Sequence, residues 1–345
     1  MSSVIGVLKE TMDAETRVAM TPDVVRKMVS AGHSVLIERG AGDQAFYSDE
    51  SYAQAGAAVM DSPADIVRGS NCIWAVNVPD AAVLSALQSG TVVIGLVHAL
   101  TRRDVILDVA SLGATLLGME YVPRISRAQG MDALSSQSNL AGYRAVVESA
   151  AFYGRAFPMM MTAAGTVPAA RVFVMGAGVA GLQAVATARR LGAVVSATDV
   201  RLAAQAQVAS LGAKFVMVED DETKAAETSG GYARDMSDAY KVKQAALIAD
   251  TISKQDIVIT TAQIPGRPAP RLVTRAMIQT MRSGSVIVDM AVESGGNVEG
   301  SVAGQVVMQN GVTIVGYKNL PGRVAYDASA LYARNVMAVF NHIFN

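Results

Sequence analysis

Three glycines and an aspartate are the residues whose types and spacing point most directly to chemistry. Gly176, Gly178 and Gly181 form a GxGxxG pattern directly after the apolar run 171–175. In this pattern the first glycine makes a tight turn, the second admits a pyrophosphate, and the third lets a helix pack closely on a strand. The pyrophosphate lies at the helix N-terminus, where unpaired N–H groups and the helix dipole favour an anion. The stretch therefore predicts a dinucleotide site.

Asp199 indicates which dinucleotide this site takes. It ends the next apolar run, 18 residues after Gly181. An acid about 20 residues after the glycines accepts hydrogen bonds from the ribose hydroxyls of NAD and repels a 2′-phosphate. Arg201 would favour NADP instead, because a nearby arginine accommodates the 2′-phosphate of NADP. We expect NADH to bind in preference to NADPH; a glycine-rich turn without a ligand is the alternative interpretation.

A second group of polar side chains lies in the stretch 121–139, ahead of a helix expected over 139–157. Arg124 and Asp132 are expected to form an ion pair that holds this loop, while Gln129 donates to a ligand. A connector needs fewer polar groups than the loop carries, so we expect ligand contacts; a hydrated surface linker is the alternative. Its polar residues are Arg124, Arg127, Gln129, Asp132, Ser135, Gln137, Ser138 and Asn139.

The hydrophobic pattern predicts the scaffold that holds these residues. Helix-like stretches that end at a glycine and continue into an apolar run recur along the chain. Glycine in the left-handed conformation closes a helix in this way, and the repetition is typical of doubly wound α/β folds. Strands are expected at 4–8, 34–37, 71–76, 91–96 and 115–118, then at 171–175, 194–199, 214–218, 256–260, 285–289, 305–308 and 312–316, with a hairpin turn at 309–311.

The length of the chain predicts two domains. At 345 residues it exceeds the size at which a single core stops growing. We predict an α/β protein with two Rossmann-like, doubly wound domains and a cleft between them, which is a common place for a ligand site. The N-terminal domain is expected over 1–136 plus 321–345, completed by a last helix at 326–340. The NAD-binding domain is expected over 137–320.

Composition excludes several classes of function. The net charge of −1 gives no field that would attract nucleic acid or an anionic membrane. No uncharged apolar run reaches the roughly 18 residues that a membrane-spanning helix needs. Cys72, the one cysteine, has no partner for an internal disulfide, and we expect a core thiol in a reducing compartment. His33, His98 and His342 lack the spacing of metal ligands, so no metal site is expected.

Four segments of the chain together resemble the NAD(H)-binding domain of proton-translocating nicotinamide nucleotide transhydrogenase. They are the loop VPRISRAQGMDALSSQSNLAGYRAV, the turn GAGVAG, and the segments GGYARDMSD and TTAQIPGRPAP. The resemblance covers nearly the whole chain. It implies an enzyme component that transfers hydride directly between NADH and NADP⁺ held on a partner domain.

The same resemblance implies partners and a location. The partners are an NADP(H)-binding domain and a membrane-spanning domain that couples the reaction to proton translocation, and the chain is expected to form a homodimer. Because it ends at Asn345 without a membrane span, we expect the partner domains to be separate polypeptides. The expected location is cytoplasmic, peripheral on the cytoplasmic face of the inner membrane through the partner subunits.

Residue roles follow from the resemblance at matching positions. Arg124, Gln129 and Asp132 match a loop that holds the nicotinamide and its ribose for hydride transfer. Ser135 and Tyr143 match residues that contact the nicotinamide end.

The resemblance also implies the residues that bind the cofactor. Asp199 matches the acid on the adenosine ribose, and Tyr232 matches a tyrosine of a mobile loop that closes over the nucleotide. The acidic, glycine-ended stretch 219–231 independently indicates such a lid. The implied set is Gly176, Ala177, Gly178, Val179, Ala180, Gly181, Asp199, Val200, Arg201, Tyr232, Thr261, Ala262 and Gln263.

Alanine dehydrogenases are the alternative family, since they share the fold and much of the pattern. The segment KETMDAETRVAMTPD, with Arg17, resembles both families, and His98 stands where the dehydrogenase keeps a catalytic histidine. The dehydrogenase has a lysine in a VKxP segment where we place Ala75 of WAVNVP, and Glu293 stands where it has an aspartate. Amino-acid oxidation needs a proton donor and acceptor at the reacting carbon, so both departures count against it.

Hydride transfer between two nicotinamides needs geometry rather than an acid or a base. A positioning loop without an obvious proton donor therefore favours transhydrogenation. A third possibility, from another class, is a regulatory protein that binds NAD and transfers no hydride.

Overall fold

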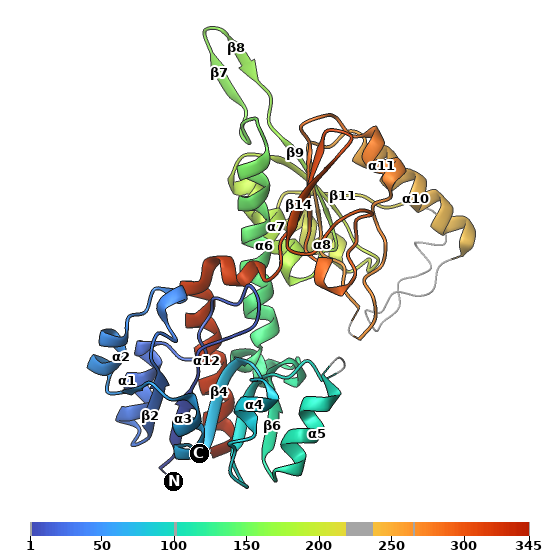
Figure 1. Cartoon of the computed structure of the whole chain (residues 1–345). Coiled ribbons are helices and arrows are strands. Elements are labelled where there is room, and N and C mark those ends of the chain that lie inside the picture. Colours follow the sequence, from blue (N-terminus) through green and yellow to red (C-terminus); the bar gives the residue numbers. More distant parts are fainter. Residues whose placement is uncertain (1, 100–101, 219–236, 265, 345) are drawn as a thin grey trace. The chain divides into compact units, whose positions relative to one another are not determined.

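The structure is a computed structural model that describes residues 2–99, 102–218, 237–264 and 266–344 (Figure 1). It divides into two compact units, with Met1–Ser138 and Pro321–Asn345 in unit 1 and Asn139–Leu320 in unit 2. Helix α6 (Ala133–Phe152) begins in unit 1 and continues into unit 2. Each unit contains a mainly parallel sheet covered by helices, which confirms the predicted α/β class with two Rossmann-like domains.

Unit 1 is built on a parallel sheet whose described strands follow the order β3-β2-β1-β4-β5-β6. This is the 3-2-1-4-5-6 order of a Rossmann fold, in which the direction of winding reverses between the first and fourth strands. The strands are β1 (Val4–Val7), β2 (Ser34–Glu38), β3 (Ala58–Met60), β4 (Cys72–Asn77), β5 (Val92–Leu96) and β6 (Thr115–Gly118).

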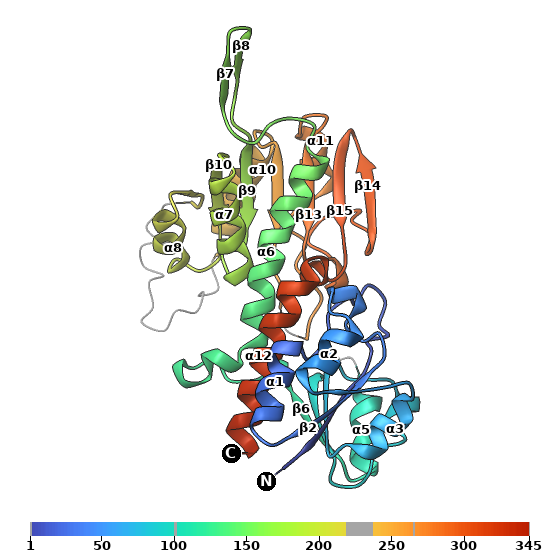
Figure 2. The same ribbon diagram turned by 90° about the vertical axis from the view of Figure 1, so that its left-hand side faces the viewer.

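Two layers of helices bury the two faces of this sheet (Figure 2). One apolar core joins the sheet to α1 (Pro22–Ser30), α2 (Asp49–Ala55) and the C-terminal helix α12 (Ala325–Phe344). The other joins it to α3 (Pro63–Gly69), α4 (Ala81–Leu84) and α5 (Arg103–Ser111). Trp74 of β4 is fully buried and contacts the ring of Phe340 on α12, so the last helix belongs to the core of unit 1.

Unit 2 repeats the order of unit 1 and adds an antiparallel strand. Its described strands run β11-β10-β9-β12-β13-β15-β14, with β14 antiparallel to β15. These strands are β9 (Arg171–Met175), β10 (Val194–Thr198), β11 (Lys214–Phe215), β12 (Ile257–Thr260), β13 (Val286–Asp289), β14 (Gln305–Gln309) and β15 (Val312–Gly316).

Alternating residues of the central strand β9 enter two different cores. Val172 and Val174 pack with α6, α7 (Val179–Arg190) and α8 (Ala204–Ser210). Phe173 and Met175 pack with α10 (Asp238–Ile252) and α11 (Arg275–Thr280). A strand covered on both faces is apolar throughout, which is why its sequence predicted a buried parallel strand.

The structure differs from the sequence prediction in several elements. Strand β3 was not predicted, and neither was the hairpin of β7 (Met160–Thr162) and β8 (Gly165–Val167). Helix α6 begins at Ala133 rather than near residue 139. Short 3₁₀ turns complete the connections at Asp43–Ala45, Met119–Tyr121, Ser126–Met131, Val292–Ser294 and Leu320–Val324.

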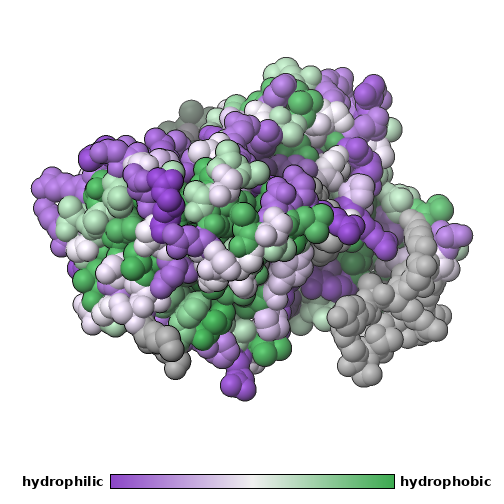
Figure 3. All heavy atoms as spheres, turned by 60° about the horizontal axis from the view of Figure 1, so that its bottom comes forward, coloured by the Kyte–Doolittle hydropathy of each residue, from purple (hydrophilic) through white to green (hydrophobic). Residues whose placement is uncertain are grey.

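The surface and core are distributed as expected for such a fold. In the face shown in Figure 3, hydrophilic and hydrophobic residues are interspersed. Cys72 is buried in β4, as predicted, and burial raises the pKa of its thiol to about 12. Within the described residues, none of the helices combines the length and apolar character needed to span a bilayer.

Candidate nucleotide-binding site

The turn after β9 has the geometry that its three glycines predicted. Gly176 has a φ of 106°, a conformation that residues with a side chain rarely adopt. A Cβ on Gly181 would overlap the carbonyl oxygen of Gly176, so only glycine lets α7 approach the strand this closely. A Cβ on Gly178 would meet no heavy atom of the described residues within 4 Å, its chain neighbours aside. Packing inside the protein therefore fixes two of the glycines and leaves the third to be explained by a ligand.

Helix α7 presents its N-terminus at this turn. Its N-cap is Gly178, which has no side chain to cap the first turn. The first N–H groups of a helix have no intrahelical acceptor, so together with the helix dipole they form a site for an anion. Ala180 is half-buried and Val179 is 41% exposed at this end of the helix. The residues present fit a bound pyrophosphate.

Asp199 lies directly after β10 and is linked to the glycine turn. Its Oδ2 accepts a hydrogen bond from the N–H of Ala177 at 2.7 Å, and its Oδ1 accepts from the N–H and Nε of Arg201 at 2.8 and 2.9 Å. Burial alone would raise the pKa of Asp199, but the hydrogen bonds from Arg201 and Ala177 lower it below its ordinary value. The carboxylate is thus ionised at neutral pH, and the neighbouring Val200 is 84% exposed.

The segment after β12 contacts the glycine turn from the other side. The hydroxyl of Thr261 donates to the carbonyl of Gly176 at 3.1 Å. Ala262 exchanges main-chain hydrogen bonds with the side chain of Asn297, and Gln263 donates to the carbonyl of Met290 at 3.2 Å. The structure therefore brings Thr261 and Ala262 to the turn and ties Gln263 to Met290 instead. Asn297 joins this segment as a residue that the sequence analysis missed.

Helix α6 reaches the same turn within unit 2. A Cβ on Gly142 would overlap the carbonyl oxygen of Ala180, so this glycine allows α6 to lie directly against the start of α7. Asn139 donates to Gln183 of α7 at 3.2 Å, while the adjacent Tyr143 is 41% exposed. A glycine inside a predicted helix was the sequence signal for this close contact.

The polar loop of unit 1 is held differently from the prediction. Both carboxylate oxygens of Asp132 bind Ser135, one through its N–H at 2.9 Å and one through its hydroxyl at 2.6 Å. Asp132 thereby caps the N-terminus of α6, which explains why the helix begins at Ala133. Arg124 and Asp132, both among the described residues, form no ion pair, so that expectation was wrong.

A residue of α12 anchors the centre of this loop. Asn335 donates to the carbonyl of Gly130 at 2.8 Å and accepts from the hydroxyl of Ser136 at 2.7 Å. It is 7% exposed, and the sequence analysis gave it no role in the site. Arg124 and Gln129, on either side of the buried Ala128, are exposed.

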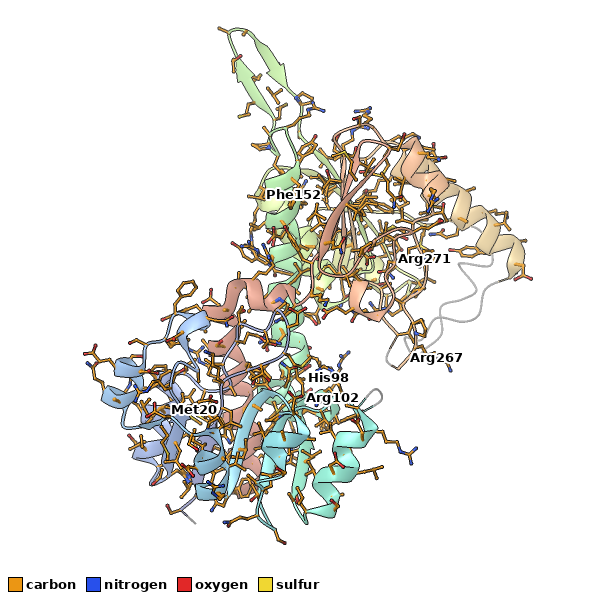
Figure 4. The ribbon with its side chains drawn as sticks, viewed as in Figure 1. Met20, His98, Arg102, Phe152, Arg267 and Arg271 are labelled. Atoms are coloured by element: carbon orange, nitrogen blue, oxygen red, sulfur yellow. The ribbon has the colours of Figure 1, made fainter. Side chains whose placement is uncertain are left out.

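Unit 1 also contains a buried polar cluster at the carboxyl end of β4. Arg17, 6% exposed, donates through Nε and one terminal nitrogen to Glu15 and through the other to Gln137. Asn77 donates to Glu15 at 2.9 Å, and its Oδ1 lies 3.1 Å from Nε2 of His98. Figure 4 labels His98 beside Arg102 at the end of β5.

Ala75 was wrongly placed at the position of the dehydrogenase lysine. The lysine of a VKxP segment stands two residues before its proline, and counting back from Pro79 gives Asn77 rather than Ala75. Ala75 is 1% exposed inside β4, whereas Asn77 belongs to the polar cluster. Because an amide does not titrate in the physiological range, the corrected position still lacks a proton donor.

Two further predictions concern the lid over the nucleotide and the absence of a metal site. Tyr232 and the stretch 219–231 lie outside the described residues. Among the residues that are described, no group of three or more histidine, cysteine, aspartate or glutamate side chains has the arrangement of a metal site.

The glycine turn, the acid after β10 and two sheets of Rossmann order define a two-domain dinucleotide-binding protein. Family models described as the N-terminal and C-terminal domains of alanine dehydrogenase/PNT match residues 6–141 and 145–345. The chain belongs to this alanine dehydrogenase/PNT family.

Individual relatives locate the chain within the family. It is 50% identical over 338 residues to the first portion of NAD(P) transhydrogenase subunit alpha of Rhodospirillum rubrum, which covers 96% of this chain and 88% of that protein. The crystal structure of transhydrogenase from Sinorhizobium meliloti has 53% identity and a TM-score of 0.91, covering 99% of this chain and 93% of that chain.

An L-alanine dehydrogenase structure is more distant, with 27% identity and a TM-score of 0.81 over 99% of this chain and 90% of that chain. These similarities confirm the predicted resemblance to a transhydrogenase component rather than to an alanine dehydrogenase. The name of the Rhodospirillum rubrum relative describes it as one portion of a subunit.

Proposed function

We propose that this chain is the NAD(H)-binding component of a proton-translocating transhydrogenase and that it presents NADH for direct hydride transfer to NADP⁺ on a partner domain. The observation that carries the proposal is the closed glycine turn, where Gly181 packs against Gly176 and the uncapped start of α7 faces the ligand side. Membership of the alanine dehydrogenase/PNT family and 50% identity to a transhydrogenase subunit support it.

The proposed binding mode assigns one half of the dinucleotide to each side of the turn. Gly178 and the first residues of α7 hold the pyrophosphate, and Asp199 accepts from the adenosine ribose. The segment from Thr261 to Gln263, on the far side of β9, borders the nicotinamide half. In a Rossmann sheet the ligand crosses where the strand order reverses, between β9 and β12 here.

Selectivity for NADH over NADPH rests on the charge at Asp199. Its carboxylate is ionised and already binds both the main chain and the guanidinium of Arg201. A 2′-phosphate would approach this carboxylate and would have to compete with it for Arg201. We therefore propose that Arg201 orients Asp199 and does not recruit NADP(H).

For hydride transfer, the protein chiefly has to position the two nicotinamide rings. When NADH is bound, it supplies the hydride, and the protein must hold the two nicotinamide rings about 3 to 3.5 Å apart and exclude water. The residues proposed for this task, from the family resemblance, are Arg124, Gln129, Asp132, Ser135 and Tyr143. The bonds between Asp132 and Ser135 give two of them a fixed geometry.

Amino-acid dehydrogenation is the second candidate, and the buried cluster of unit 1 counts against it. A 2-oxo acid needs a cation for its carboxylate, but Arg17 is buried and its guanidinium donates to Glu15 and Gln137. A proton donor at the reacting carbon is also needed, and Asn77 provides none. Glu293, the other departure, accepts from the N–H of Asn319 at 3.1 Å.

The proposal includes the assembly. The partners are an NADP(H)-binding domain and a membrane-spanning domain, which would keep this chain peripheral on the cytoplasmic face of the inner membrane.

We further propose that the chain forms a homodimer through the β7–β8 hairpin, which extends beyond the rest of unit 2 in Figure 2. Met160 and Met161 on this hairpin are 43% and 78% exposed, and an isolated two-stranded hairpin is marginally stable in water. Light scattering of wild type and M160S/M161S tests this.

Two assays on the purified chain test the reaction. One follows NADH oxidation with pyruvate and ammonium, and the other follows NADH-dependent reduction of an NADP⁺ analogue after an NADP(H)-binding partner domain is added. We expect turnover in the second assay alone. Turnover in the first would establish the dehydrogenase, and tight NADH binding with no turnover in either would establish the regulatory alternative.

Loop variants separate positioning from binding. R124A, Q129A and D132A are expected to slow hydride transfer much more than they weaken NADH binding. R127A, an exposed arginine of the same loop, is the matched control and should behave like wild type. Equal losses of rate and affinity in the three variants would mean that the loop only builds the binding site.

A further inference from the structure

We infer that Asn297 is a positioning residue for the nicotinamide half of the dinucleotide and that it acts through the main chain of Ala262. The inference rests on the proposed function, because it assigns a role within the same nucleotide site. Asn297 lies in the loop after β13 and has 0% exposure.

The side chain of Asn297 binds Ala262 as a neighbouring strand would. Its Oδ1 accepts from the N–H of Ala262 at 3.1 Å, and its Nδ2 donates to the carbonyl of Ala262 at 2.9 Å. The second Nδ2 hydrogen donates to the carbonyl of Pro270 at 2.8 Å. A single amide thus fixes both polar groups of Ala262 and ties them to the end of the loop that follows.

The main chain of Asn297 is equally constrained. Its N–H donates to Asp289 at 3.1 Å, and its carbonyl accepts from the N–H groups of Leu272 and Val273 at 2.8 and 3.0 Å. Asp289, at the end of β13 with 0% exposure, also accepts from the N–H groups of Ala291 and Val298. The amide of Asn297 is therefore held rigidly against the sheet.

A further contact closes the loop around this asparagine. Arg271, labelled in Figure 4, donates to the carbonyl of Val298, the residue after Asn297. Val273 and Val298 also form a parallel bridge. The two loops after β12 and β13 are thus joined into one assembly with Asn297 at its centre.

The position of Ala262 decides which half of the ligand this assembly serves. Ala262 follows β12, which pairs with β9 on the side opposite to β10 and Asp199. The adenosine half lies with the glycine turn and the acid, so the segment after β12 borders the other half. Ala262 is half-buried, and the neighbouring Gln263 and Ile264 are exposed, which leaves this segment accessible on one side.

The experiment compares NADH with ADP, which carries the adenosine half and two phosphates but no nicotinamide. N297D keeps the size of the side chain and one acceptor, but replaces both donors by an oxygen that faces two carbonyls. We expect it to lower the affinity for NADH at least tenfold and the affinity for ADP less than twofold. N310D is the matched control, since Asn310 makes the same substitution possible in the β14–β15 turn of the same unit, and both affinities should stay within twofold of wild type.

Two further measurements keep the inference testable if N297D does not fold. N297S removes both amide donors without adding a charge and carries the same expectation. In the wild-type chain, amide hydrogen exchange of a peptide that covers 261–264 should slow on addition of NADH and not of ADP. No difference between the two ligands in this exchange would contradict the inference.

The outcomes separate this inference from the proposed function. Equal losses of NADH and ADP affinity would show a merely structural role for Asn297 and overturn the inference. So would unchanged NADH binding in N297D. A wild-type chain that does not bind NADH would instead overturn the proposed function, and the inference with it.

Discussion

Replacing Glu10 with glutamine should change how the stability of unit 1 depends on pH. Glu10 is half-buried and accepts hydrogen bonds from the N–H groups of Val76 and Asn77 at the end of β4. Burial, reinforced by the neighbouring charge of Glu15, raises the pKa of Glu10 from 4.5 to about 7. Between these two values the folded chain holds a proton that the unfolded chain has lost.

The sign and size of the effect follow from this difference. Because the folded state binds the extra proton, the free energy of unfolding that Glu10 contributes falls as the pH rises from 4.5 to about 7. At 1.36 kcal/mol for each pH unit, the loss amounts to about 3 kcal/mol. Below pH 4.5 the contribution is complete, and above pH 7 it is gone. Glutamine does not titrate, so E10Q should gain about 3 kcal/mol relative to wild type across this range.

Denaturant unfolding monitored by tryptophan fluorescence provides the assay. The chain has one tryptophan, Trp74, and it is fully buried in β4, so its emission reports on unit 1. E50Q makes the same chemical change at an exposed position of α2 and should alter stability by less than about 0.5 kcal/mol at every pH. Parallel pH curves for E10Q and wild type would refute the reasoning.

Three more predictions concern the nucleotide site and its support. D199N should weaken NADH binding about 10- to 100-fold, the value of a charged hydrogen bond, and reduce the preference over NADPH; titration with both nucleotides measures this. G181A should destabilise unit 2 by about 3 kcal/mol or more because of its overlap with Gly176, whereas G178A should cost less than about 1 kcal/mol yet abolish tight NADH binding; thermal melts with and without NADH compare them. N335L releases the carbonyl of Gly130 and should slow hydride transfer about fivefold to tenfold with an NADH affinity within twofold of wild type; equal losses would contradict an anchoring role.

Elements with a strong local pattern were predictable from the sequence. Most of the described strands in both sheets are apolar runs that follow a glycine closely, and Asn310-Gly311 gave the β14–β15 turn, where both residues have positive φ. Strand β3 was not predicted because it has only three residues at the edge of the sheet, and a run of that length shows no hydrophobic periodicity. The β7–β8 hairpin was not predicted because its methionines and small residues do not form a pattern typical of strands.

In the candidate site, too, the residues with a local sequence pattern were predictable and the residues with long-range contacts were not. Residues that act through sequence spacing, such as the glycines and Asp199, were found, whereas Asn297 and Asn335 bind partners 35 and 205 residues away. Such contacts exist only after folding. The expected Arg124–Asp132 ion pair failed for the opposite reason. Ser135, three residues from Asp132, offers a local capping bond that needs no loop to close.

Unit 1 shows why the shared topology could not settle the function. Both units have the Rossmann strand order, with the reversal between β1 and β4 in one and between β9 and β12 in the other. In unit 2 the segment after the first strand is a glycine turn that leaves helix N–H groups for a ligand. In unit 1 the segment after β1 carries Glu10, whose carboxylate accepts from Val76 and Asn77 across the reversal point. The same place in the fold thus holds a carboxylate that binds the chain itself, and the residues that follow the first strand distinguish this place from the nucleotide site of unit 2.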